Sequence, residues 1–522
     1  MDDGTRDPFG FLARQWRTFT SHMEPAVFIP AASLVVGFVV FGTGFSEAAA
    51  SAFESAQAFI VDTFGWFYVL STTILLIGVL TLIFGPAGRI KLGKPDEEPE
   101  FPRLTWFTMM LSAGMGIGIV FFGVAEPIQH FAAPPTTEGG TREAALEAMR
   151  FTFFHWGVHP WAIYSAIALP IAFFHFREGL PMAPRSMLHP LIGDRIHGPI
   201  GHAVDTLCVV GTLFGVATSL GLGATQINAG LDRLAGAPQV TWVQIVIIAA
   251  ITLIATVSVV SGIKIGIRRL SEGNIGLMMV LLLFVFIAGP TVFQLDLLVA
   301  GLGRFVQTLP GTSLRVAVGV DQGWQADWTL FYWSWWISWS PFVGVFTARI
   351  SRGRSIREFV LTAMLVPAGL GFLWFAVVGG TGIEAQLSGR ADIAASVVEN
   401  EALSLYELLD LLPLSSVTAV LATLLIVVFF ITSSDSGSLV DDMVTSGGDP
   451  NPPSVQRVFW AVSEGAVAIT LLVAGGLSAL RTASLTTGLP IALLLMVGVY
   501  GLRRAITREL RRQREASGTR IE

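Results

Sequence analysis

The sequence predicts an all-α integral membrane protein with about twelve transmembrane helices. The 522-residue chain is 52% hydrophobic and only 13% charged, roughly half the charged share of an ordinary soluble domain. Uncharged apolar segments recur along its whole length, and about 20 such residues suffice to cross a hydrocarbon core of about 30 Å. Basic residues also cluster in alternate connecting segments, as they do in proteins with many membrane spans.

The apolar segments can be placed in order along the chain. They lie near residues 26–48, 64–86, 104–125, 151–174, 201–224, 240–262, 273–292, 328–348, 359–380, 415–434, 456–476 and 483–502. Residues 1–25 are polar and precede a full-length span, so we expect a cytoplasmic N-terminal segment and no cleaved signal peptide. Residues 503–522 form a basic cytoplasmic tail beside the membrane surface.

The charge distribution orients these spans in a cell (inner) membrane. All but seven of the 32 Lys and Arg residues fall on the side that holds both termini, and cytoplasmic segments are the basic ones. Both termini are therefore expected to be cytoplasmic. The net charge of −6 comes mainly from acidic external loops, which argues against a nucleic-acid partner. The single cysteine, Cys208, lies within a span, so an intramolecular disulfide is excluded.

The third span carries three alternating glycines, Gly114, Gly116 and Gly118. Each lowers the cost of leaving helical geometry by about 1 kcal/mol relative to alanine. Close helix packing through small residues is the alternative interpretation. Transporters build ion and substrate sites where helices unwind in mid-membrane, so we expect a broken helix here.

The eighth span contains Pro341, and we expect a second interruption there. Two interrupted spans at corresponding positions of two five-helix units are typical of inverted-repeat transporters. This predicts two peripheral helices (26–103), a first repeat (104–292), an external connecting segment (293–327) and a second repeat (328–502).

Two aromatic clusters lie in apolar surroundings. The fourth span carries Trp156, Trp161 and Tyr164, which fall within an arc of about 140° on a continuous helix. The eighth span carries four tryptophans in seven residues: Trp333, Trp335, Trp336 and Trp339. Aromatic boxes bind quaternary ammonium groups through ring quadrupoles. Lipid packing is the alternative, and we favour it for the isolated Trp66, Trp106 and Trp242 near span ends.

Hydroxyl side chains end the tenth span, in the sequence FFITSSDSGSLV. Thr432 and Ser433 there are candidate ligands for a small hard cation, although such hydroxyls also bond back to their own helix. A serine enzyme is disfavoured because the chain has no GxSxG motif. ATP-driven transport is disfavoured because it has no GxxxxGK[ST] loop.

These motifs together resemble the betaine/choline/carnitine transporter family over nearly the whole chain. The resemblance rests on AGMGIGIVFFGVAEP, FHWGVHPWAIY and WSWWISWSPFVGVFTARISRGRSIREF, in this order. It implies two inverted five-helix repeats of the leucine-transporter type, preceded by two extra helices. It also implies secondary transport, with no enzymatic activity and no cofactor beyond sodium as coupling ion. Relatives often form trimers.

The resemblance assigns roles to individual residues. It implies a substrate box of Trp156, Trp161, Tyr164 and Trp336, with Trp335 and Trp339 on the substrate path and with Met115 and Gly118 beside it. It places sodium between backbone oxygens of Ser112 and Met115, the Phe429 carbonyl, and the hydroxyls of Thr432 and Ser433. A second sodium would use Thr212 and Phe342, but Val216 stands where the family has a further hydroxyl. A single sodium is therefore expected.

Gly118 also bears on the solute. Choline-carrying relatives tend to have an acidic residue at this position, which balances the charge of choline, whereas a zwitterion brings its own carboxylate. The expected function is therefore sodium symport of a glycine betaine-like compatible solute (osmoprotectant uptake). Proton-coupled choline transport, and ectoine, carnitine or proline carriage by the same fold, remain the alternatives.

Overall fold

The computed structural model describes residues 17, 19–261, 264–319, 322–453 and 455–516. This part of the chain is helical, and its β-pairing is limited to an isolated bridge between Lys91 and Ser355. The helices are α2 (Pro25–Gly44), α3 (Ser46–Thr81), α4 (Arg103–Gly114), α5 (Ile117–Ala132), α6 (Arg142–Trp156), α7 (Val158–Glu178), α8 (His189–Ile192), α9 (Pro199–Ala235), α10 (Thr241–Ser261), α11 (Lys264–Ala288), α12 (Thr291–Ser313), α13 (Gln322–Gln325), α14 (Phe331–Ile350), α15 (Ile356–Leu387), α16 (Ile393–Glu399), α17 (Ser404–Asp410), α18 (Ser415–Thr445) and α19 (Val455–Ala516).

Each expected span coincides with helical structure. Nine helices in the described part of the chain are long and apolar enough to cross a membrane, so the protein is a multi-pass membrane protein. The eleventh and twelfth spans both fall in α19, which is two helices joined at a kink where Gly475 and Gly476 leave helical geometry. The number of twelve crossings stays a prediction, as does the inverted repeat.

The third span is broken where the glycines predict. Helix α4 ends at Gly114, Met115 is extended (φ −108°, ψ 92°), and α5 begins at Ile117 after a non-helical Gly116. The fourth span is also broken, which the sequence analysis did not predict. Gly157 (φ −86°, ψ −135°) separates α6 from α7.

The expected interruption at Pro341 is wrong, because α14 runs without a break from Phe331 to Ile350. Proline removes the N–H that would bond to the carbonyl four residues earlier, here that of Ile337. The Ser340 hydroxyl donates to this carbonyl at 2.7 Å and satisfies it. The irregular geometry lies one step earlier, in the π-helix Ala326–Leu330 that leads into α14.

The expected connecting segment 293–327 contains most of α12, which packs against α6 and α15. This helix is itself long and apolar enough to be a candidate span. The domain boundaries drawn from the sequence therefore stay predictions.

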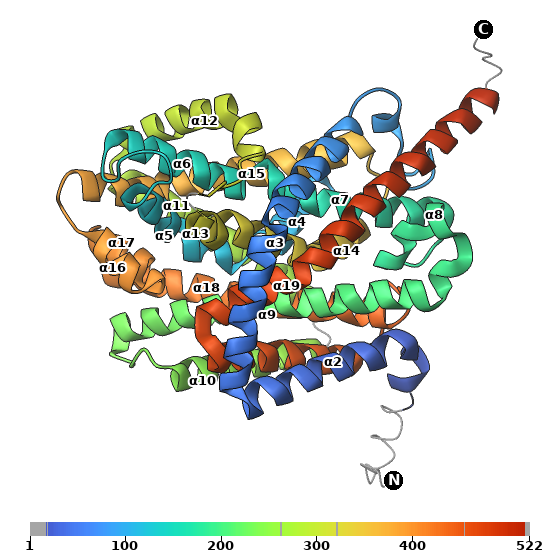
Figure 1. The fold of residues 1–522 in the computed structure, drawn as a ribbon, viewed down its shortest axis with the longest axis horizontal. Coiled ribbons are helices and arrows are strands. Elements are labelled where there is room, and N and C mark those ends of the chain that lie inside the picture. The colour runs from blue at the N-terminus through green and yellow to red at the C-terminus, as the bar shows by residue number, and fades with distance from the viewer. Residues whose placement is uncertain (1–16, 18, 262–263, 320–321, 454, 517–522) are drawn as a thin grey trace, which may run out of the picture.

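Helix α14 lies inside the bundle and packs against α7, α9 and α19, while α18 packs against α9 (Figure 1). In Figure 1 the start of α2, the short α8 and the end of α19 lie toward the right, and α16 and α17 lie at the left. Segments that the sequence assigns to opposite sides of the membrane thus lie at opposite ends of the molecule. Which end faces the cytoplasm stays a prediction.

Candidate functional site

The two aromatic clusters predicted from the sequence come together in the core. Trp156 is the last residue of α6, Trp161 and Tyr164 lie on α7, and the remaining rings lie on α14. The six predicted rings are all buried, at most 4% exposed: Trp156, Trp161, Tyr164, Trp335, Trp336 and Trp339. Ring centroids lie 4.9 Å apart for Trp156 and Trp336, and 6.2 Å apart for Tyr164 and Trp336.

The ring planes are arranged like adjacent walls. Trp336 stands at 78° to Trp156 and at 85° to Tyr164, and Tyr164 stands at 77° to Trp161. The rings of Trp335 and Trp336 are stacked, with centroids 4.9 Å apart and an angle of 13° between their planes, so Trp335 lies behind Trp336. The indole N–H of Trp336 donates to the His155 carbonyl at 3.0 Å, which fixes the ring's orientation.

The prediction that Trp156, Trp161 and Tyr164 share one continuous helix is wrong, because the chain breaks at Gly157. Because the chain breaks there, Trp156 belongs to a different helix from Trp161 and Tyr164, and its place is not given by a rotation of 100° per residue. The rings still meet, since α7 packs against both α6 and α14 and the Trp156 ring contacts the Trp336 ring. Glycine is favoured at the break because a Cβ at position 157 would overlap the Phe153 carbonyl and the Phe372 ring.

The glycines of the third span lie against these rings. A Cβ on Gly114 would overlap the Trp161 ring, and a Cβ on Gly118 would lie 2.5 Å from Trp335. A Cβ on Gly116 would lie 3.4 Å from both Trp339 and the Ser433 hydroxyl. The segment from Gly114 to Gly118 therefore lies directly beside the aromatic rings. The roles of Met115 and Gly118 in solute binding stay predictions.

The three isolated tryptophans behave differently from one another. Trp66 and Trp242 are 53% and 62% exposed, as expected for rings that face lipid. Trp106 is fully buried, and its indole N–H donates to the Ser351 hydroxyl at 2.9 Å. The lipid-facing interpretation of Trp106 is therefore wrong, because α4 packs against α14 and α15.

The residues predicted for sodium lie on the two expected elements. Ser433 on α18 is close to Gly116 in the break, as described above. The Thr432 hydroxyl donates to the carbonyls of Val428 (2.9 Å) and Phe429 (3.2 Å), which is the local bonding that was the alternative interpretation. Ser112 lies in the last turn of α4, and its side chain is outside the described part. The ion itself stays a prediction.

The proposed second sodium pair lies on adjacent helices, with Thr212 on α9 and Phe342 on α14. The Thr212 hydroxyl is buried and has no hydrogen-bond partner among the described residues. Phe342 packs against Trp339, with ring centroids 6.0 Å apart. The role of this pair also stays a prediction.

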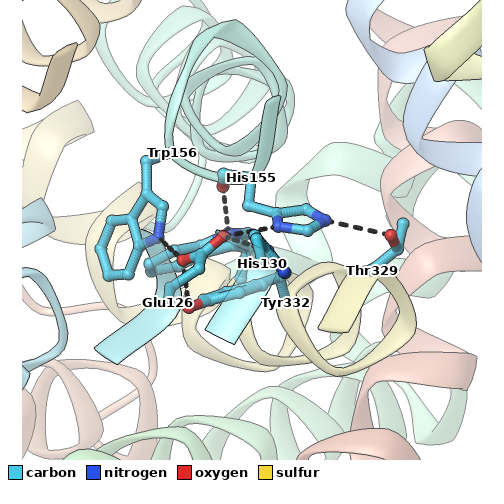
Figure 2. A network of polar contacts seen from close by, with 7 residues as sticks. Glu126, His130, His155, Trp156, Thr329 and Tyr332 are labelled. Atoms are coloured by element: carbon cyan, nitrogen blue, oxygen red, sulfur yellow. Dashed lines mark hydrogen bonds and ion pairs between the residues drawn. The ribbon is translucent and has the colours of Figure 1, made fainter. Parts of the chain in front are cut away.

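A buried carboxylate that sequence reasoning missed connects the aromatic walls (Figure 2). Glu126 on α5 is fully buried. Its Oε2 accepts hydrogen bonds from the indole N–H of Trp156 (2.7 Å) and the hydroxyl of Tyr332 (2.6 Å). Its Oε1 is hydrogen-bonded to His155 Nδ1 (2.7 Å) and His130 Nε2 (3.2 Å). The available signal was a lone glutamate in an apolar span, which is a candidate functional residue by default.

This hydrogen-bond network links three helices. Glu126 comes from α5, Trp156 and His155 from the end of α6, and Tyr332 from the first turn of α14. His155 reaches further, through Nε2, to the Thr329 hydroxyl at 3.0 Å in the π-helix. Glu126, His130 and His155 are residue types that bind metal ions, and their ligand atoms lie within 4.8 Å of one another. Zinc bonds of about 2.0–2.2 Å would hold neighbouring ligands more than 3 Å apart, so the 2.7 Å contact is a hydrogen bond.

Comparison with known proteins gives a consistent result. A family model described as BCCT, betaine/carnitine/choline family transporter, matches residues 26–511. The glycine betaine transporter OpuD of Bacillus subtilis is 44% identical over 494 residues, which cover 94% of this chain and 96% of OpuD. An uncharacterised transporter of Mycobacterium tuberculosis is 46% identical, covering 92% of this chain and 82% of the relative. A glycine betaine/proline/choline transporter of Vibrio parahaemolyticus is 41% identical, covering 93% and 90%.

Proposed function

Because the chain belongs to the betaine/carnitine/choline transporter family, we propose that it imports a zwitterionic compatible solute, such as glycine betaine, by sodium symport. The family is one of transporters, and we assign the chain no catalytic role. Transport of a betaine- or choline-type solute follows from the family and its relatives. The choice of a zwitterion and of sodium is the specific part of the proposal.

The aromatic box carries the proposal. The rings of Trp156, Trp336, Tyr164 and Trp161 lie in contact, with the planes of neighbouring rings nearly perpendicular. A quaternary ammonium group has no N–H to donate, so attraction to ring faces is its main source of binding energy, about 2 kcal/mol for a desolvated ring. The rings are in contact with one another here, so binding requires them to separate, as alternating access allows.

The charge of the site favours a zwitterion over choline. On α5, Gly118 has no side chain and abuts Trp335. The buried carboxylate Glu126 is already hydrogen-bonded at both oxygens. A solute with its own carboxylate therefore needs no acidic partner, and we propose that the polar backbone freed around Met115 and Gly116 binds that carboxylate.

Sodium coupling is supported by where the α18 hydroxyls lie. Ser433 on α18 lies next to Gly116 in the unwound segment, and Gly116 also lies next to Trp339, which the resemblance places on the substrate path. A cation held between α18 and this break would tie the two elements together beside the solute. Its occupancy would then change solute affinity, and by linkage the solute would change sodium affinity by the same factor.

A panel of radiolabelled glycine betaine, choline, carnitine, ectoine and proline, assayed in proteoliposomes, tests the choice of solute. We expect glycine betaine to be taken up in preference to choline. Preferential uptake of choline would favour the second candidate, a choline carrier, which the mixed solute range in the name of the Vibrio parahaemolyticus relative supports. Uptake of none of the five would contradict the proposed function.

A further inference from the structure

Residues 388–414, which join α15 to α18, form a folded loop. The loop contains α16, a short 3₁₀ helix (Glu401–Leu403) and α17, and both α-helices pack against α5 (Figure 1). The three leucines of α17 are fully buried, so the loop is docked on the helices beneath it. It therefore lies over α5, the helix that carries Glu126.

Glu401 joins this loop to two other helices. Its Oε1 accepts hydrogen bonds from Arg481 on α19 (3.1 Å) and from the side-chain amide of Gln129 on α5 (3.1 Å). Its Oε2 accepts from the same Arg481 nitrogen at 3.2 Å. The side chains of Glu401 and Arg481 are only 15% and 19% exposed, so water and salt screen this ion pair less than a surface pair.

Arg481 in turn lies against the aromatic residues of α14. Its guanidinium carbon lies over the Phe331 ring, 5.2 Å from the ring centroid, and a guanidinium within about 6 Å of a centroid is attracted by the ring. The rings of Phe331 and Trp335 are stacked, with centroids 5.4 Å apart and an angle of 15° between their planes. Trp335 is stacked on Trp336 in the same way. A continuous series of contacts thus connects Glu401 to the aromatic box.

The loop has other polar contacts, and they lead away from the box. Asp410 forms two hydrogen bonds of 2.7 Å with Arg233 near the end of α9, and these side chains are 37% and 42% exposed. Asn400 donates to Gln239 at 2.7 Å. Neither contact involves a residue of α14. The Arg233–Asp410 pair therefore attaches the same loop to the protein without touching the aromatic rings.

We infer that Glu401 and Arg481 form a latch that holds the loop closed over the solute site and, through Phe331 and Trp335, positions Trp336 in the box. The inference rests on the proposed transport function, because it gives the pair a role in solute binding. While the latch is formed, the guanidinium is fixed over Phe331, and the stacked rings behind it are held in place. When the latch opens, Arg481 and the stack are released together. Loop closure and solute binding therefore favour each other by linkage.

The first arm of the test measures equilibrium binding of radiolabelled glycine betaine to the purified full-length protein in nanodiscs at saturating sodium. Arg481→Gln should raise the dissociation constant about fivefold, whereas Arg481→Lys keeps a cation over Phe331 and should restore most of the affinity. Glu401→Gln should act in the same direction but less, because Asp327 in the π-helix also interacts with the Arg481 charge. Asp410→Asn breaks the other ion pair and is the matched control, with unchanged affinity.

A double-mutant cycle tests the route through the rings. In a Phe331→Leu background, Arg481→Gln should have little further effect on affinity, because the ring that connects Arg481 to the box is gone. Thermal unfolding shows whether each variant is folded. Wild-type affinity in folded Arg481→Gln protein would overturn the inference, and so would an effect of equal size in the two backgrounds.

The second arm contains no solute and follows hydrogen–deuterium exchange of the loop amides by mass spectrometry. Amides of residues 393–403 should exchange about threefold faster in Arg481→Gln than in the wild type, because exchange reports local opening. Added betaine should slow this exchange in the wild type more than in Arg481→Gln. Equal exchange in the two proteins without solute would overturn the latch. If the wild type binds no solute of the panel, the proposed function fails, while this arm still decides whether the latch exists.

Discussion

Replacing Trp336 by leucine removes the ring that links the two halves of the aromatic box. The centroid of the Trp336 ring lies 4.9 Å from that of Trp156 and 6.2 Å from that of Tyr164, and the side chain is only 4% exposed. A desolvated ring contributes about 2 kcal/mol to binding of a quaternary ammonium group. Because about 1.4 kcal/mol corresponds to a tenfold change in affinity, the dissociation constant for glycine betaine should rise about 25-fold.

The loss of a large buried side chain has a second effect, on stability. Trp336→Leu also removes the hydrogen bond to the His155 carbonyl. Truncation of a buried tryptophan to alanine costs about 3–5 kcal/mol, and leucine should cost less because it refills part of the space. Trp106→Leu is a matched control, because Trp106 is equally buried and donates to Ser351 at the far end of α14. It should lower the unfolding temperature by a similar amount and leave affinity unchanged.

The assay is a scintillation proximity measurement of radiolabelled betaine binding, which avoids the change in intrinsic fluorescence that a tryptophan variant brings. Both leucine variants are compared with the wild type at saturating sodium. If Trp336→Leu protein of confirmed fold binds betaine with wild-type affinity, the box is not the binding site. If Trp106→Leu weakens binding equally, the effect is one of general destabilisation.

Three further predictions concern the surroundings of the box. Glu126→Gln keeps the side-chain volume but weakens charge-assisted hydrogen bonds, each of which contributes about 1.5–3 kcal/mol. It should therefore loosen Trp156 and weaken betaine binding about tenfold. Unchanged binding would show that the carboxylate does not orient the Trp156 ring. Thr432→Ala with Ser433→Ala should shift half-maximal sodium to a concentration at least tenfold higher, and an unchanged sodium curve for uptake would remove these hydroxyls from the ion site. Gly118→Asp should shift preference toward choline while slowing transport, because its Cβ would lie 2.5 Å from a tryptophan ring; measured choline-to-betaine uptake ratios equal to wild type would refute the electrostatic explanation of this glycine.

The sequence was sufficient to predict the class of protein and most of the helices. Long uncharged segments have few alternatives in a bilayer, so their positions follow from hydropathy alone. The break at Met115 and Gly116 was also predictable, because three alternating glycines remove the side chains that stabilise a helix. Gly114 and Gly118 also lie against tryptophan rings, so a side chain at either position would overlap a ring. This is a second, steric reason for glycine there.

Short-range contacts decided two features that the sequence analysis predicted wrongly. Pro341 was expected to break α14, but the hydroxyl of the preceding serine satisfies the carbonyl that proline leaves free. Gly157 was read as one residue of a continuous span, although it ends α6. Both outcomes depend on local hydrogen bonds and neighbouring side chains, which hydropathy and periodicity do not encode.

The buried polar groups were the hardest to predict. Glu126 lies in the segment GVAEP. Three of its four hydrogen-bond partners come from two other helices and lie up to about two hundred residues away in sequence, while His130 lies one turn later on α5. Glu464 likewise finds Ser434 on another helix. Only the packing of the helices brings such pairs together, so a single sequence identifies each carboxylate as unusual without identifying its partner.

The central claim is sodium-driven accumulation of a zwitterionic solute, and one uptake measurement tests it most directly. Purified protein is reconstituted in proteoliposomes loaded with potassium, and labelled glycine betaine uptake is followed after dilution into sodium or potassium buffer at equal pH on both sides. We predict accumulation above the external concentration in sodium buffer, collapse of that gradient when a sodium ionophore is added, and no accumulation in potassium buffer. Equal accumulation in the two buffers would contradict the account.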